Sequence, residues 1–171
     1  MTVPAPTVRV LVCGSADRGD DGAALTAIAH VLPALGRETC GRLEVRRCPQ
    51  LDASDVIDVA PDEIVLILDT VLGIEAGEVI EVPLEALLGS TALAPRSSHA
   101  LPIQQVLGIA EAVRGGLPTG RFIGIGGKWF GFGPTRSRAL RHGMPAFEDA
   151  IRDAITRLAA VASLAGIAAL V

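Results

Sequence analysis

The feature of this sequence that most constrains its fold is the alternation of short apolar runs with segments of helical periodicity. Residues 8–13 and 63–68 are rich in Val, Ile and Leu, as strands buried on both faces are, and 121–125 are expected to form the last strand. Between them, apolar residues recur at helical spacing over 24–35 and 101–114. Strands that alternate with helices predict an α/β fold, a three-layer α/β/α sandwich with a largely parallel central sheet.

Shorter elements complete the expected fold. Apolar and polar residues alternate over 43–47, as in an edge strand, and residues 52–59 fit a short helix. A short strand is expected over 78–82, and a loop with one helical turn over 84–98. A glycine-rich loop over 126–134 precedes a long helix, expected from about Pro145 to Leu164. No repeat or interdomain linker interrupts the chain, so residues 1–171 are expected to form a single domain.

Composition narrows the classes of partner. The net charge is −4 and only 3% of residues are aromatic, so neither attraction for phosphate backbones nor stacking platforms favour a nucleic-acid partner. The uncharged stretch 158–171 is shorter than the roughly 20 residues of a membrane-spanning helix and is expected to pack as a helix, with no membrane partner. Three cysteines without CxxC spacing, and no readable secretory signal, predict reduced thiols and a cytoplasmic protein.

Five polar residues follow the predicted strands or begin the predicted helices. Asp20 and Asp21 lie in the loop after the first strand, Asp69 ends the central strand, His99 precedes a helix, and Lys128 follows the last strand. Ligands of open α/β sheets bind beyond the carboxyl ends of the strands. The sequence therefore predicts that these side chains converge on one edge of the sheet.

Each of these residues also has an ordinary structural interpretation. Asp20 or Asp21 is suited to cap the following helix, although one cap does not need two acids. Asp69 is suited to a turn, His99 to a solvated surface position, and Lys128 to a solvated loop in which the adjacent Trp covers the sheet edge. Gly22, just inside the helix, costs about 1 kcal/mol relative to Ala and indicates that something approaches the backbone closely there.

Taken together, Asp21, Asp69 and His99 form a candidate metal site. Two carboxylates and one imidazole suit a borderline divalent ion such as nickel or zinc, with a coordination position left open. Nucleophilic catalysis is disfavoured because no G-x-S-x-G elbow is present and no cysteine has a neighbouring base. Nucleotide binding is disfavoured because the glycine motifs have the wrong spacing and the first loop is acidic.

Three motifs, in this order and spacing, resemble the hydrogenase maturation endopeptidases. The loop Gly14-Ser-Ala-Asp-Arg-Gly-Asp-Asp-Gly22 is similar to that family's G-N-x-x-x-x-D-[DE]-G, and the apolar strand ending in Asp69 and the Ser98-His99 pair before a helix are the other two. The resemblance covers most of the chain. It implies a phosphorylase/hydrolase-like α/β/α sandwich, and it assigns Asp21, Asp69 and His99 as the metal-binding and catalytic residues.

The resemblance also implies an activity and a substrate. Members of the family remove the C-terminal extension from the [NiFe]-hydrogenase large-subunit precursor. The metal is nickel supplied by that substrate, so no resident cofactor is expected. A monomeric peptidase is implied. Ser15 replaces the family's Asn, and Gly127-Lys128-Trp129 stands where relatives often have an acidic residue and Pro, which leaves substrate choice open.

Two other functions stay open. A receiver-like phosphoacceptor module also uses an acid pair, a strand-end Asp and a Lys, although a receiver places its acid pair directly at the end of the first strand. Here Gly14 to Gly19 intervene, and His99 would have no role. A non-catalytic protein that binds a hydrogenase precursor without cleaving it is the second alternative.

Overall fold

The central element of the fold is a five-stranded sheet. The computed structural model describes residues 8–94 and 100–168. The strands lie in the order β2-β1-β3-β5-β4, and their bounds are β1 Val8–Cys13, β2 Leu43–Cys48, β3 Ile64–Val71, β4 Val79–Pro83 and β5 Gly120–Gly126. Strands β2, β1, β3 and β5 are parallel, and β4 pairs antiparallel with β5 at one edge.

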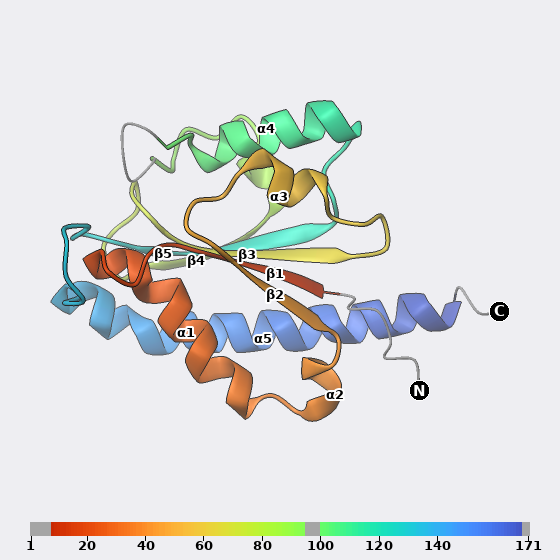
Figure 1. Cartoon of the computed structure of the whole chain (residues 1–171), viewed down its shortest axis with the longest axis horizontal. Coiled ribbons are helices and arrows are strands. Elements are labelled where there is room, and N and C mark those ends of the chain that lie inside the picture. The colour runs from red at the N-terminus through yellow and green to blue at the C-terminus, as the bar shows by residue number, and fades with distance from the viewer. Residues whose placement is uncertain (1–7, 95–99, 169–171) are drawn as a thin grey trace.

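Helices cover both faces of this sheet, as Figure 1 shows. One face carries α1 (Ala23–Val31) and the long α5 (Arg138–Ala168), and the other carries α3 (Ala53–Ile57) and α4 (Ile103–Arg114). Short connecting helices are η1 (Gly19–Gly22), η2 (Leu32–Ala34), α2 (Arg37–Cys40) and η3 (Leu84–Leu87). The predicted three-layer α/β/α sandwich with a largely parallel sheet is therefore confirmed.

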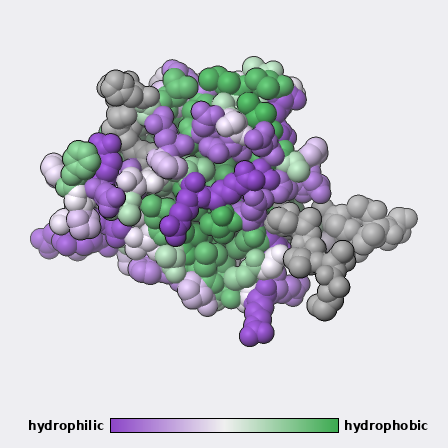
Figure 2. All heavy atoms as spheres, in the orientation of Figure 1, coloured by the Kyte–Doolittle hydropathy of each residue, from purple (hydrophilic) through white to green (hydrophobic). Residues whose placement is uncertain are grey.

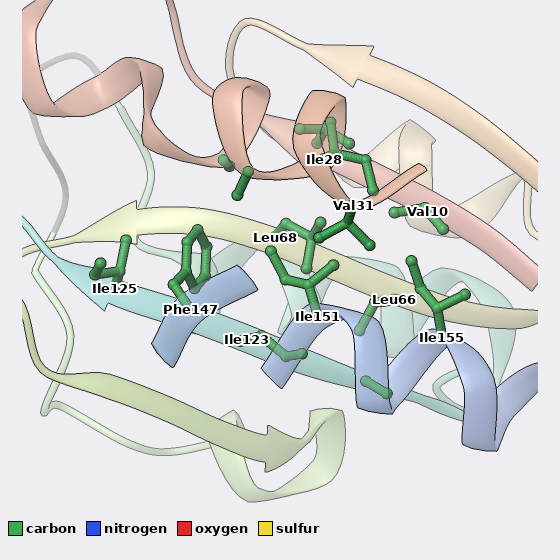
Figure 3. Close-up of a cluster of buried hydrophobic side chains, with 14 of the residues drawn as sticks. Val10, Ile28, Val31, Leu66, Leu68, Ile123, Ile125, Phe147, Ile151 and Ile155 are labelled. Atoms are coloured by element: carbon green, nitrogen blue, oxygen red, sulfur yellow. The ribbon is translucent and has the colours of Figure 1, made fainter. Parts of the chain in front are cut away.

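Side chains alternate between the two faces of each central strand, so both layers receive an apolar core. Leu66 and Leu68 of β3 face α1 and α5, where they pack in one buried cluster with Phe147 and Ile151 (Figure 3). Ile67 of β3 belongs to a second buried cluster, on the face covered by α3 and α4. Strand β3, which contributes side chains to both cores, carries the candidate residue Asp69 near its carboxyl end.

Two predicted boundaries are wrong, and both corrections concern the candidate site. Strand β3 was expected to end in Asp69 but continues to Val71, because Asp69, Thr70 and Val71 still pair with β5. Helix α5 begins at Arg138 and contains Pro145 in its interior. Its true start is marked by Ser137, whose hydroxyl oxygen accepts the backbone N–H of Leu140 at 3.2 Å, a capping bond.

The remaining elements agree with the sequence-based expectations within a few residues. Residues 43–47 fall in the edge strand β2, 79–82 fall in β4, and the described part of 84–98, residues 84–94, contains the turn η3. Among the described residues, no helix combines the length and the apolar character needed to cross a membrane.

Candidate active site

The candidate site lies where the carboxyl ends of β1 and β3 meet the loop that precedes α1. After Gly14, this loop runs through the turn η1 and delivers Asp20 and Asp21 to the rim of the sheet. The Thr70 hydroxyl, buried in β3, donates a hydrogen bond to the carbonyl oxygen of Asp20 at 3.0 Å. This bond fastens the loop to the strand that carries Asp69.

Asp21 is almost fully buried, with a relative exposure of 7%. Its Oδ2 accepts the backbone N–H of Ser15 at 2.9 Å, so the carboxylate holds the turn that leads out of β1. Gly14 makes this turn possible, because its φ is +119° and a Cβ there would lie 2.0 Å from the Asp21 carbonyl oxygen. The Ser15 side chain is not needed for this bond, so the departure from the family's Asn leaves the bracing of Asp21 intact.

Asp20 is a structural residue that braces the loop after β5. Its Oδ2 accepts the backbone N–H groups of Lys128 and Trp129 at 2.8 and 3.0 Å and the Ser137 hydroxyl at 2.7 Å, and its Oδ1 accepts the Ser137 N–H at 2.7 Å. Burial raises the pKa of Asp20, but these bonds outweigh it and hold the pKa below its ordinary value. Neither Asp20 nor Asp21 makes a side-chain cap to η1 or α1, so the capping interpretation is wrong.

Asp69 lies two residues before the end of β3, on the face covered by α3 and α4. It lines a small cavity of about 40 Å³ together with Thr70, Leu93, Ala100 and Ile103. Desolvation by the surrounding protein raises the pKa of Asp69 to about 8, although the N–H of Thr70, which donates to its Oδ1 at 2.8 Å, acts in the opposite direction. A carboxyl in this position is largely protonated at neutral pH.

Two reduced cysteines lie beside Asp69. Cys13 and Cys48 are register partners at the ends of β1 and β2, and both are buried. A hydrogen bond with Cys13 lowers the pKa of the Cys48 thiol, and the Cys48 thiolate contributes to the raised pKa of Asp69. Both side chains belong to the buried cluster on the face covered by α3 and α4, the face on which Asp69 lies.

The raised pKa of Asp69 predicts a pH-dependent stability. Between about pH 4 and pH 8 the native state keeps a proton that the unfolded chain releases, so the free energy of unfolding falls as pH rises. This single group contributes at most about 1.4 kcal/mol per pH unit. We expect Asp69→Asn to lose that slope and to gain stability relative to the parent toward pH 8, measured by urea unfolding at pH 5 and pH 8. Equal pH slopes in the two proteins would contradict the assignment.

The five predicted rim residues do not all converge. Asp20 and Asp21 lie at the rim with Asp69, but Asp20 is occupied in holding the loop after β5. Lys128 lines a groove beside α5 and is not among the residues that line the cavity of Asp69. His99 lies outside the described residues. Within 8–94 and 100–168, no group of three His, Cys, Asp or Glu side chains is arranged to hold a metal ion.

Three residues that brace the site were not identified from the sequence. Thr70 ties β3 to the acidic loop, and Ser137 binds Asp20. Arg136 donates to the Gly22 carbonyl and to Thr26, and a Cβ at Gly22 would lie 3.2 Å from its guanidinium. The close approach expected at Gly22 is therefore confirmed, because the backbone of Ala16 lies even nearer, with its Cα 3.1 Å from the position of such a Cβ. Ser137 could have been identified from the sequence, because it is a Ser directly before the arginine-rich start of a helix.

Comparison with known proteins relates this arrangement to solved structures. No protein-family model matches the sequence. No curated protein matches it either. Solved structures do match: the [NiFe] hydrogenase maturation protease HybD from Thermococcus kodakarensis is 22% identical, with a TM-score of 0.57 over 85% of this chain and 97% of that chain.

Two further structures give the same result. The maturation protease HycI from Thermococcus kodakarensis KOD1 is 20% identical, with a TM-score of 0.61 over 87% of this chain and 92% of that chain. The hydrogenase maturating endopeptidase HybD from E. coli is 13% identical, with a TM-score of 0.66 over 88% of this chain and 92% of that chain. This chain has the fold of the hydrogenase maturation endopeptidases.

The maturation-endopeptidase fold accounts for nearly the whole of the matched structures as well as most of this chain. The similarity therefore extends to the fold of most of this chain.

Proposed function

We propose that this protein is an endopeptidase that removes the C-terminal extension of a nickel-loaded [NiFe]-hydrogenase large-subunit precursor. In this proposal Asp21, Asp69 and His99 engage the nickel that the substrate brings. The observation that carries it is the position of two carboxylates within the maturation-endopeptidase fold: Asp69 lies near the carboxyl end of β3, and Asp21 lies in the loop that follows the adjacent strand β1.

The surroundings of the two carboxylates support roles as ligands for a metal that arrives with the substrate. Asp21 is fixed by the Ser15 N–H, and Asp69 by the Thr70 N–H, so neither side chain needs to be ordered when nickel arrives. Because Asp69 holds a proton at neutral pH, it loses that proton when it becomes a ligand, and engagement of nickel by this group strengthens as pH rises.

The proposed chemistry assigns separate tasks to substrate and protein. Nickel in the precursor supplies a Lewis acid that either polarises the scissile carbonyl or activates a water molecule. Asp21, Asp69 and His99 fix the position of the precursor relative to the protein, which keeps the scissile bond near the metal. The enzyme thereby recognises precursors that have already received nickel.

The proposal is tested by incubating the protein with candidate large-subunit precursors, each with and without nickel, and following the intact mass. We expect loss of a C-terminal fragment from one nickel-loaded precursor and no loss from its nickel-free form. Binding without any change of mass would favour the non-catalytic precursor-binding alternative. Failure of every loaded precursor to bind or to be cleaved would contradict the proposal.

The receiver-like alternative is disfavoured by the position of Lys128. A receiver needs its lysine beside the phosphoaccepting Asp, whereas Lys128 and Asp69 line different pockets of this protein. Treatment with a small phosphodonor and Mg²⁺ distinguishes the two functions. We expect no mass increase, and an acyl phosphate on Asp69 would instead establish the receiver function.

A further inference from the structure

A shallow groove of about 650 Å³ lies beside the beginning of α5, and its walls are basic. Lys128, Arg138 and His142 line it, and its floor consists of small residues such as Gly77 and Ala139. Arg141 is exposed in the same helical turn. We call Lys128, Arg138, Arg141 and His142 the basic surface. Figure 2 shows hydrophilic residues gathered over the beginning of α5, at the left edge of the view.

The basic surface has no acidic partner in the part of the chain that the structure describes. Arg9, Arg121 and Arg152 each form an ion pair with a carboxylate, but no residue of the basic surface does. In the neighbouring turn, the carboxylate of Glu78 accepts the N–H of Glu75 at 3.1 Å. Three cations, Lys128, Arg138 and Arg141, are thus left without an ion pair on a protein whose net charge is −4.

This distribution of charge is unfavourable for the isolated protein. The first turn of a helix favours acids, yet α5 has no acidic residue in its first turn and carries Arg138 and Arg141 near its start. The first acid of the helix is Glu148, which binds His30 at 2.8 Å. Charged side chains that lie where the helix dipole disfavours them, with no opposite charge beside them, are expected at functional surfaces. There a binding partner supplies the opposite charge.

Exposed aromatic side chains extend this surface along the loop after β5. Trp129 is 54% exposed and Phe132 is 86% exposed, whereas Phe122 and Phe147 are fully buried. The Arg18 guanidinium lies over the Phe132 ring, 5.3 Å from its centre, a cation–π contact. Exposed aromatics beside arginines are the residue types that anchor protein interfaces.

We infer that the basic surface and the adjoining Trp129–Phe132 loop form a docking site for an acidic polypeptide segment that carries at least one large apolar side chain. Its carboxylates pair with Arg138, Arg141 and Lys128, and its apolar side chain packs on Trp129 and Phe132. This inference rests on the proposed function in taking the segment to be part of the hydrogenase precursor. An acidic protein needs such a local positive surface to attract an acidic partner.

Trp129 provides a direct test, because the chain has one Trp and no Tyr. A short synthetic peptide of Glu and Leu residues is titrated into the protein while Trp fluorescence is recorded, with a Lys-for-Glu peptide as the control ligand. We expect saturable change of emission with the acidic peptide only, weakened by high salt. No change, or equal responses to the two peptides, would overturn the inference.

Matched variants locate the interaction. The double substitution Arg138→Glu and Arg141→Glu is expected to weaken binding of the acidic peptide at least about tenfold. The control, Arg37→Glu with Arg47→Glu, changes the net charge equally on exposed residues of α2 and β2 and is expected to leave the affinity unchanged. Equal weakening by both double variants would show that only net charge matters and would overturn the docking site.

The same variants separate this inference from the proposed function. If a precursor is cleaved, Arg138→Glu with Arg141→Glu is expected to raise KM and leave kcat unchanged. Cleavage of the precursor with an unaltered KM would leave the peptidase proposal standing and would overturn the docking site. If no precursor is cleaved, the peptidase proposal fails, and the peptide titration still decides the docking site on its own.

Discussion

Asp21→Asn and Asp69→Asn are each expected to slow removal of the precursor's C-terminal extension by roughly 100-fold or more. Asn keeps the shape of the side chain but removes the negative charge that makes a carboxylate a ligand for nickel. Loss of a ligand or of its support typically costs at least 10-fold to 100-fold in metal affinity or activity. The rate is measured by intact mass of the nickel-loaded precursor at several times of incubation.

Asp17→Asn is the matched control for this experiment. Asp17 lies in the same loop as Asp21, but its side chain is exposed to solvent. We expect Asp17→Asn to cleave the precursor at the parent rate, and His99→Ala to behave like the other two site variants. Normal processing by Asp21→Asn or Asp69→Asn, with the fold intact, would exclude that residue from the nickel-engaging set.

Asp20→Ala is expected to destabilise the protein by about 3 kcal/mol, the largest effect on stability of any single substitution considered. The substitution leaves the N–H groups of Lys128, Trp129 and Ser137 without their carboxylate acceptor. A buried donor without a partner costs about 1–3 kcal/mol, and several lie together here. Urea unfolding measures the change, and amide hydrogen exchange at Lys128 and Trp129 shows whether the loop after β5 is released.

The pH dependence of this effect provides an internal check. The pKa of Asp20 is held below 3.8, so its bonds stabilise the native state above about pH 4 and that stabilisation is lost as pH falls through the lowered pKa. The difference between the parent and Asp20→Ala is therefore expected to shrink in acid. Asp17→Ala is expected to change stability by less than about 0.5 kcal/mol, and a loss as large as that of Asp20→Ala would contradict the bracing role.

The fold was predictable because its central strands are mostly apolar. The run 63–68 and the strand Val8–Cys13 contain one charged residue each, Glu63 and Arg9, which pair with each other at 2.8 Å, and only a sheet covered on both sides buries the apolar remainder of such strands. Boundaries were less predictable. Asp69 and Thr70 continue β3 because β5 supplies their backbone partners, and Pro145 lies within α5 because Ser137 begins the helix earlier. The first correction depends on pairing between segments far apart in the sequence, and the second depends on a local cap three residues from its partner.

The candidate site was predictable only in part, for a similar reason. Strand-end positions placed Asp21 and Asp69 at one rim. The different role of Asp20 depends on Lys128, Trp129 and Ser137, which lie more than a hundred residues later in the chain. From their positions in the sequence alone, Asp20 and Asp21 cannot be distinguished. Only the folded loop distinguishes the bracing carboxylate from the one at the rim.

The central claim, that the rim carboxylates engage the nickel of the substrate, is tested most directly by measuring four affinities. The parent and Asp69→Asn are each bound to nickel-loaded and nickel-free precursor at low temperature, with intact mass used to verify that the precursor stays uncleaved. The account predicts that Asp69→Asn weakens binding of the loaded precursor at least about tenfold and leaves binding of the nickel-free form unchanged. Equal effects on both forms, or no effect on either, would contradict it.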